Sequence, residues 1–320
     1  TNTNDTGLGS LRAAASTGED IDIETDGTLS IESPINFNGS ITIKGPSTGN
    51  LFIIKSAPPI SETDPESEYA VTIQNGHTLT FSNQSLNVPI VPADSSSENT
   101  EVIITGFSSQ KSWVGPIEDS LTVTIDQSLL GDITLKGKNT FDGALNIRNG
   151  IVNASKSDNL GSSAGTINMT DGVLNATDTF SLERDFNIGG ELSGFQVSSN
   201  KELTLNGTIS GSGPITCSGG EEPLSGGTLI LTADNSGYTG AISVSGALSY
   251  TNDNNLGSGK NITLTGGQLT TPATFTTEKN IQLEGTGFIN VTGDNELTAP
   301  GVFSGDILVK MGTGTLTLSG

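Results

Sequence analysis

The chain has 320 residues, a formal net charge of −22 at pH 7, and an apolar fraction of only 32%. This fraction is low for one large globule, but it is sufficient for a solenoid, in which each layer buries only its inner faces against its neighbours. The acidity repels phosphate backbones and anionic lipid, so it argues against nucleic-acid and membrane-surface partners. The single cysteine, Cys217, excludes an internal disulfide, and no apolar run is long enough to span a membrane as a helix.

The first expected element is a helical turn or two over residues 10–15, and no later segment has helical periodicity over ten residues. Short strands follow, in which apolar residues alternate with Thr, Ser or Asn, and Gly, Asn or Asp follows within two residues. This pattern predicts an all-β chain whose strands each bury one face. Examples of such strands are residues 29–31, 41–43, 71–73, 121–125, 133–135, 203–205, 262–264 and 316–318.

The first 130 residues contain three interruptions rich in Pro, Ser and acidic residues, about 56–70, 89–100 and 107–119. Each is flanked by strand-like sequence, so we expect loops that protrude from a regular scaffold rather than linkers between domains. We therefore expect residues 1–130 to form a loop-bearing first part and residues 131–320 a regular second part.

The second part contains a long internal repeat, with copies at about 139–233 and 235–320, that keeps its order while the offset drifts from 97 to 87 residues. A β-helix coil takes roughly 20–25 residues, so one copy is expected to fill about four coils. The predicted fold is a right-handed, single-stranded parallel β-helix with an N-terminal cap coil. Matching segments are 141–147 with 238–244, 159–162 with 255–258, 167–174 with 262–269, and 227–231 with 314–318.

Two segments carry a family resemblance. Residues 1–14, TNTNDTGLGSLRAA, resemble the opening motif of bacterial surface β-helices, in which this segment forms the first coil and the cap. The repeat, with Gly312–Gly320, Asn255–Ser258 and Gly266–Leu269, resembles the autotransporter-associated β-strand repeat. The match covers about residues 131–320, and Phe141-Asp142 departs from it where Tyr-Thr is usual. The sequence is thus identified as resembling the passenger of a bacterial autotransporter, the surface-exposed part of a type V secretion system.

This resemblance implies a location at the bacterial cell surface or in the medium, and a chain that continues beyond Gly320. It implies an adhesin or interaction scaffold whose partner is a host-cell surface protein or glycan. Rows of polar residues along stacked coils also permit an alternative, in which the partner is another copy of the chain and the protein promotes aggregation. A second alternative is a glycan-active β-helix enzyme.

Candidate contact residues lie in the expected loops. Trp113, with Lys111 beside it, is either a contact anchor or a residue packed against the scaffold. The acidic run with its following tyrosine is either a solvated loop or a site for Ca²⁺ or a basic partner. Its members are Glu62, Asp64, Glu66, Glu68 and Tyr69.

Catalytic and metal motifs are not found. His77 is the only histidine and lies in an expected turn, and no nucleophile motif, EF-hand loop or calcium nonapeptide occurs. Only three arginines are present, which disfavours a lyase site for acidic sugars, whereas chance pairs among 35 acidic residues leave a hydrolase open. We therefore expect no catalytic site, no resident metal and no cofactor other than a weak case for Ca²⁺.

Overall fold

A computed structural model describes most of the chain. The residues outside the description are 1–9, 23–27, 32–33, 46–52, 57–70, 83–84, 88, 95–98, 107–110, 114, 128–130 and 220–225. The described strands stack in parallel as a β-solenoid of about 11 turns, which confirms the predicted fold class.

The chain divides into two compact units. The first comprises Thr1–Val152 and Asp158–Gly165, and the second comprises Asn153–Ser157 and Thr166–Gly320. The boundary expected at residue 130 remains a prediction. Strand stacking continues past this residue, because β10 pairs with β12 and β12 pairs with β14.

In chain order, the elements up to this division are α1 (Leu11–Ala15), β1 (Ile21–Asp22), β2 (Thr28–Ile31), β3 (Ile35–Phe37), β4 (Ile41–Lys44), β5 (Ile53–Ser56), β6 (Val71–Ile73), β7 (Thr78–Ser82), β8 (Ser85–Asn87), β9 (Ile90–Pro92), β10 (Glu101–Thr105), β11 (Lys111–Trp113), β12 (Thr122–Asp126), β13 (Asp132–Leu135), β14 (Leu145–Arg148), β15 (Ile151–Ala154) and the 3₁₀ helix η1 (Ser157–Leu160).

The remaining elements are β16 (Ile167–Thr170), β17 (Val173–Ala176), β18 (Phe180–Leu182), β19 (Phe186–Gly189), β20 (Gly194–Val197), β21 (Glu202–Leu205), β22 (Ile209–Gly211), β23 (Ile215–Ser218), β24 (Thr228–Leu231), β25 (Ile242–Val244), β26 (Ala247–Tyr250), the 3₁₀ helix η2 (Asp253–Leu256), β27 (Asn261–Leu264), β28 (Gln268–Thr271), β29 (Phe275–Thr276), β30 (Asn280–Val291), β31 (Glu296–Ala299), β32 (Phe303–Met311) and β33 (Thr315–Leu318).

The core consists of rows of inward side chains that lie in register from turn to turn. In the first unit, Leu79, Val102, Val123 and Leu145 are consecutive partners on β7, β10, β12 and β14, and all four are fully buried. The alternation seen in the sequence is therefore the alternation between this dry interior and the outer surface.

The N-terminal helix forms where the sequence predicts it. Ser10 is the N-cap of α1, and its side-chain oxygen accepts a hydrogen bond from the backbone N–H of Ala13. Leu11 and Ala15 are buried. Residues 1–9, which complete the expected cap coil, lie outside the description.

Two of the expected loops contain strands. Residues 90–92 form β9, which pairs with β6, and residues 111–113 form β11, which pairs with β13. The sequence-based loop assignment is corrected for these six residues. In β9, Ile90 and Pro92 are buried on either side of a more exposed Val91, so the strand does alternate, but the neighbouring prolines at 89 and 92 conceal this pattern.

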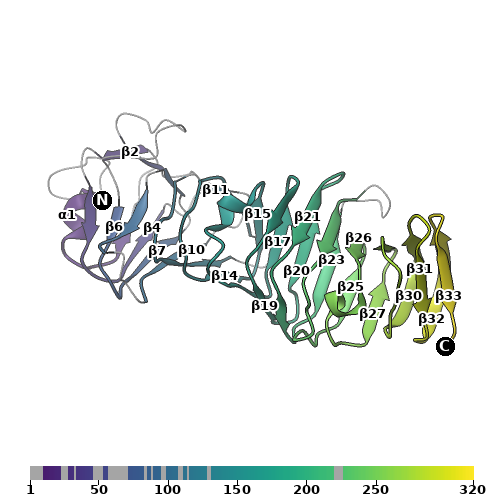
Figure 1. The fold of residues 1–320 in the computed structure, drawn as a ribbon. Helices are drawn as coiled ribbons and strands as arrows, with labels where there is room; N and C mark the ends of the chain where they lie inside the picture. The colour runs from purple at the N-terminus through teal and green to yellow at the C-terminus, as the bar shows by residue number, and fades with distance from the viewer. Residues whose placement is uncertain are drawn as a thin grey trace. The chain divides into compact units, whose positions relative to one another are not determined.

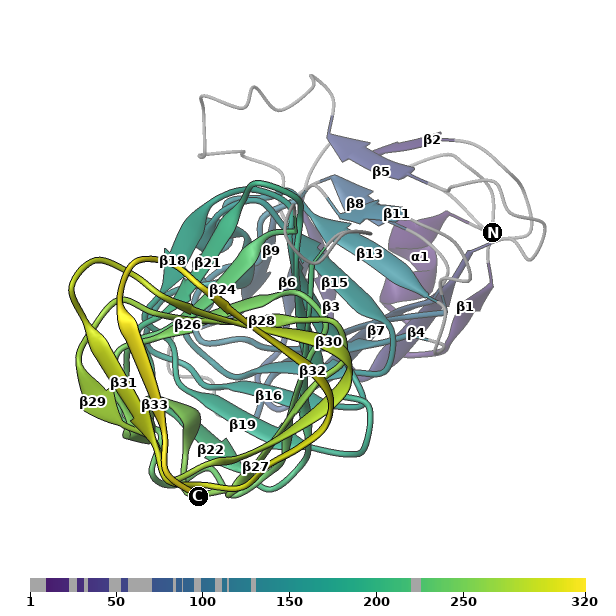
Figure 2. The ribbon, with the colours of Figure 1, turned by 90° about the vertical axis from the view of Figure 1, so that its right-hand side faces the viewer.

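The second unit has four parallel ladders (Figure 1). One comprises β16–β19–β22, a second runs β17–β20–β23–β25–β27–β30, a third runs β18–β21–β24–β26–β28–β30, and a fourth runs β29–β31–β33. The 12-residue strand β30 joins the second and third, because its first part pairs with β27 and its last part with β28. The ladder β29–β31–β33 forms a side of this unit separate from the β24–β26–β28 ladder (Figure 2).

The long repeat does not fill a whole number of turns. Strand β16 lies in the first ladder, but its repeat equivalent β27 lies in the second. Likewise, β24 belongs to the third ladder, whereas its equivalent β33 belongs to the β29–β31–β33 ladder. One copy therefore takes four turns and one additional side, so equivalent segments of successive copies point in different directions.

Gly211, at the end of β22, lies where two neighbouring turns approach each other closely. It has φ +101°, and a Cβ at this position would collide with the backbone oxygen of Ile188 in the preceding turn. Its repeat equivalent Gly305 has φ +102° and the same kind of collision with Leu283. We expect Gly211→Ala to lower the free energy of unfolding by about 1–3 kcal/mol, measured by urea denaturation.

Gly237→Ala is the matched control, because no atom lies within 4 Å of a Cβ built there. Equal stability of the two variants would contradict the close approach of neighbouring turns at Gly211.

Candidate binding surface

The acidic candidates and their neighbouring tyrosine, Glu62, Asp64, Glu66, Glu68 and Tyr69, lie outside the described residues. Lys111 belongs to β11, but its side chain is not described. The contact role of these six residues therefore remains a prediction.

Trp113 is fully buried. Its indole Nε1–H donates a hydrogen bond of 2.9 Å to the backbone oxygen of Gly115, and its ring contacts Phe81 edge-on with a centroid distance of 5.3 Å. The sequence left two alternatives for Trp113, and the structure agrees with the one in which it packs against the scaffold. Its burial corrects the expectation of a contact anchor, since no part of its side chain is presented to a partner.

The outer surface of the second unit carries rows of uncharged polar side chains. One row follows the second ladder through the registered partners Thr216, Ser243, Thr263, Gln282 and Ser304. Because neighbouring strands of a sheet are about 4.8 Å apart, these groups form a regular line of hydrogen-bonding groups without charge.

Exposed acidic residues of the second unit lie mainly in the turns between strands. Asp178 is an example, and its carboxylate forms an ion pair of 2.7 Å with Lys201 of the next turn. The hydrogen bond from Lys201 lowers the pKa of Asp178, with a smaller contribution from the backbone N–H of Thr179. Both side chains are well exposed, so this pair contributes little to stability.

Two buried asparagines fix the corner between neighbouring turns. The Asn235 side chain accepts a hydrogen bond from the N–H of Ile209 (2.6 Å) and donates one to the backbone oxygen of Asn255 (2.7 Å). The Asn255 side chain donates to the backbone oxygens of Thr232 and Ala233. These amides satisfy backbone groups that the turn leaves without strand partners.

The same arrangement occurs in the other copy of the repeat. Asn139 accepts from the N–H of Ile117 (2.9 Å) and donates to the backbone oxygen of Asn159, and Asn159 donates to the oxygen of Gly137 (3.1 Å). The recurring Asn-Leu-Gly-Ser segment thus marks a structural corner and not a ligand site.

The aromatic residue at the equivalent position of each copy is also structural. Phe141 and Tyr238 are both buried. The Tyr238 hydroxyl donates to the backbone oxygen of Gly213 or of Ala241, each 2.9 Å away. Burial raises the pKa of Tyr238 above its usual range, so the hydroxyl stays protonated and keeps its donor.

Two buried cationic side chains were not predicted from the sequence. Arg184 and Lys279 are 2% and 3% exposed, and they are the only charged side chains buried among the described residues. They occupy equivalent places in the segments Thr179–Gly190 and Thr274–Gly285, both of which begin Thr-Phe and continue with Glu before the cation. That recurring Glu-cation pair is the signal that would have located them.

The described residues contain no group of three or more His, Cys, Asp or Glu that could hold a metal ion. Within that part of the chain, no helix has the length and apolarity needed to cross a membrane.

One curated protein is similar to the chain. It is the adhesin BmaC autotransporter of Brucella suis biovar 1 (strain 1330), which is 30% identical over 203 residues, or 62% of this chain. The resemblance to an autotransporter passenger is confirmed. The matched part of this passenger-like chain spans only about 5% of the length of that relative. No family model matches the chain, and no solved structure matches it.

The buried corner of the passenger-like repeat gives one prediction. We expect Asn255→Ala to lower the free energy of unfolding by about 2–3 kcal/mol, because it leaves several backbone groups of the turn unsatisfied. Asn254→Ala, an exposed neighbour in η2, should change it by less than about 0.5 kcal/mol. Chemical denaturation of both variants measures the difference. Similar losses of unfolding free energy in both variants would contradict the stabilising role of the Asn255 side chain at this corner.

Cys217 in β23 gives a second prediction. It is 1% exposed, and burial raises the pKa of its thiol to about 12. We expect the thiol to resist Ellman's reagent at pH 8 in the folded protein and to react at once in denaturant. Rapid reaction without denaturant would show that the solenoid is open at β23.

Proposed function

We propose that this chain is part of a surface-exposed autotransporter adhesin that acts as a non-enzymatic scaffold for attachment to host cells or matrix. The observation that carries this proposal is the similarity to an autotransporter adhesin in a chain that folds as a parallel β-solenoid. The proposed location is the outer surface of the bacterium, with release into the medium as the alternative.

The structure of the described residues supports a scaffold role in two ways. The turns rest on in-register apolar contacts, and one corner of each repeat copy also rests on buried asparagines, so the polar outer surface can vary without loss of the core. The outward row of the second ladder from Thr216 to Ser304 is uncharged, which allows approach of a partner despite the net charge of −22.

For the contact segment, we retain residues 57–69 as a proposal from the sequence. The acidic members Glu62, Asp64, Glu66 and Glu68 suit a basic partner surface or Ca²⁺. Trp113 is left out because it is buried.

Deletion of residues 57–69 tests this proposal. We expect the variant to keep the β-rich circular dichroism spectrum of the parent chain and to bind cultured host cells or matrix-coated wells several-fold more weakly. A deletion of residues 221–224 in the second unit is the control and should bind normally. Equal binding of all three proteins would place the contact surface elsewhere.

The same preparations address the enzymatic alternative. Reducing-sugar release from a glycan panel should remain at background. Turnover that scales with protein concentration would contradict the scaffold proposal.

Self-association is a second candidate, favoured by the uncharged row on the second ladder. If this row pairs with a second copy, introducing like charges with Thr216→Glu and Thr263→Glu should shift dimers to monomers in analytical ultracentrifugation. Asn187→Glu, an exposed outward residue of β19, is the control. A parent chain that stays monomeric at high concentration would remove this candidate.

A further inference from the structure

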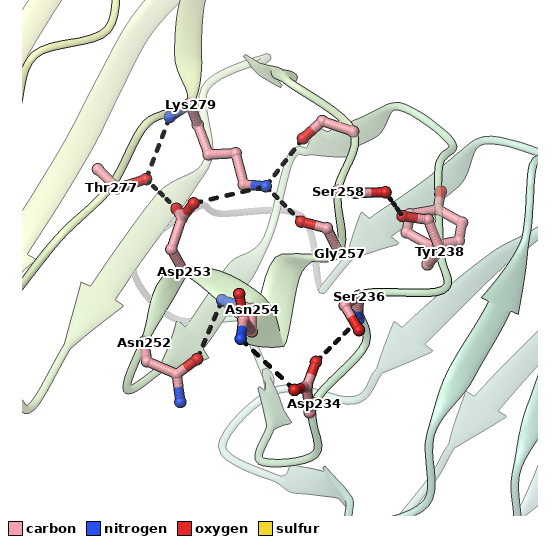
Figure 3. A network of polar contacts seen from close by, with 11 residues as sticks. Asp234, Ser236, Tyr238, Asn252, Asp253, Asn254, Gly257, Ser258, Thr277 and Lys279 are labelled. Carbon is pink, nitrogen blue, oxygen red and sulfur yellow. Dashed lines mark hydrogen bonds and ion pairs between the residues drawn. The ribbon is translucent and has the colours of Figure 1, made fainter.

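The side chain of Lys279 lies inside the second unit, beneath the turn that carries η2. Its Nζ donates to the backbone oxygen of Gly257 and, at 2.9 Å, to that of Gly259 (Figure 3). The ammonium therefore bridges two carbonyls at the end of the turn that leads from η2 into β27.

An acidic side chain completes the arrangement. The Asp253 carboxylate lies 3.8 Å from the Lys279 Nζ and also accepts a hydrogen bond of 2.6 Å from the hydroxyl of Thr277 (Figure 3). Asp253 is the first residue of η2, so the lysine contacts both the beginning of this 3₁₀ helix and the segment after its end.

The conformation of the turn explains why a lysine is buried at this position. Gly257 has φ +77° and is buried, and its carbonyl accepts a hydrogen bond from the Lys279 Nζ. A buried carbonyl without a donor is costly, whereas an ammonium can donate to several acceptors at once. Burial of the ammonium lowers the pKa of Lys279, and the opposite charge of Asp253 limits this effect, while the nearby Lys260 adds to it.

The other copy of the repeat places Arg184 in the equivalent position. It is also buried, and its Nη2 donates to the backbone oxygen of Thr166 (3.3 Å) in the preceding turn. The following turn is matched as well: Gly207 is packed against the carbonyl of Arg184, and Gly301 against the carbonyl of Lys279. A buried cation is therefore a feature of the repeat and not of one turn.

We propose that Lys279 is a latch, which holds closed the turn preceding it and so determines whether that surface turn opens locally. In the second copy, the latched segment is Thr251–Lys260, which exposes Asn252, Asn254 and Ser258. The Lys279 side chain holds this polar surface through the backbone beneath it and is itself buried.

Hydrogen–deuterium exchange of the whole chain tests the latch. In Lys279→Met, the backbone amides of residues 251–260 should exchange at least about tenfold faster, while those of β25 and β26 keep their protection. Lys279→Arg should retain most of the protection, because the repeat itself uses Arg at the equivalent position. Lys260→Met, which removes an exposed lysine, is the control and should leave the segment unchanged.

Asp253→Asn provides a milder second variant, and it should accelerate exchange in the same segment by a smaller factor. Unchanged exchange of residues 251–260 in Lys279→Met would overturn the proposal. Faster exchange throughout the second unit, or loss of folding in this variant, would also overturn it, because the lysine would then be a global core residue and not a local latch.

Discussion

Every other feature of this fold depends on the in-register stacking of parallel strands. Because each strand pairs with the strand one turn earlier, an inward residue lies directly against the inward residue of its neighbour. The row Ile242, Ile262, Ile281 and Phe303 in the second ladder shows this arrangement. A low overall apolar content is sufficient, since each turn needs only one or two such residues on each side.

The same stacking creates the problem that the buried polar groups solve. Strand amides and carbonyls pair along the ladders, but some buried backbone groups of the turns have side-chain partners instead. Asn255 lies in η2 and Lys279 lies beneath the turn that carries η2. Together with Asn235, each of these side chains satisfies backbone groups of a neighbouring turn. These polar contacts define where a turn ends, whereas the apolar rows supply most of the stabilisation.

The sequence predicts the strands well where alternation is clean. The segment 203–205 lies within β21, and 262–264 lies within β27. It fails at β9, where prolines conceal the pattern, and at β11, where Trp113 is the only apolar residue. It also fails at Arg184 and Lys279, because a charged residue is ordinarily expected at the surface and only the three-dimensional turn reveals its acceptors. The candidate contact residues were predicted from loop composition alone, and Trp113 shows the limit of that approach, since composition does not determine burial.

Successive copies of the repeat are displaced by one side of the solenoid, and this displacement affects which surface each copy presents. Since one copy advances by four turns and one side, the equivalent strands β16 and β27 belong to different ladders. Conserved features of the repeat thus do not line up into one extended strip, which is consistent with their role in maintaining turns. We therefore expect a partner to be recognised by features of the chain that are not repeated.

Engineered disulfides test the stacking register most directly. In a Cys217→Ser background, the pair Ser243→Cys and Thr263→Cys places two outward cysteines on registered strands one turn apart, about 4.8 Å between Cα atoms, which a disulfide can bridge. The pair Ser243→Cys and Gln282→Cys lies two turns apart, beyond the reach of a disulfide. We expect rapid oxidation to a monomeric disulfide in the first pair and none in the second. Equal oxidation in both pairs, or oxidation only in the second, would contradict the stacking.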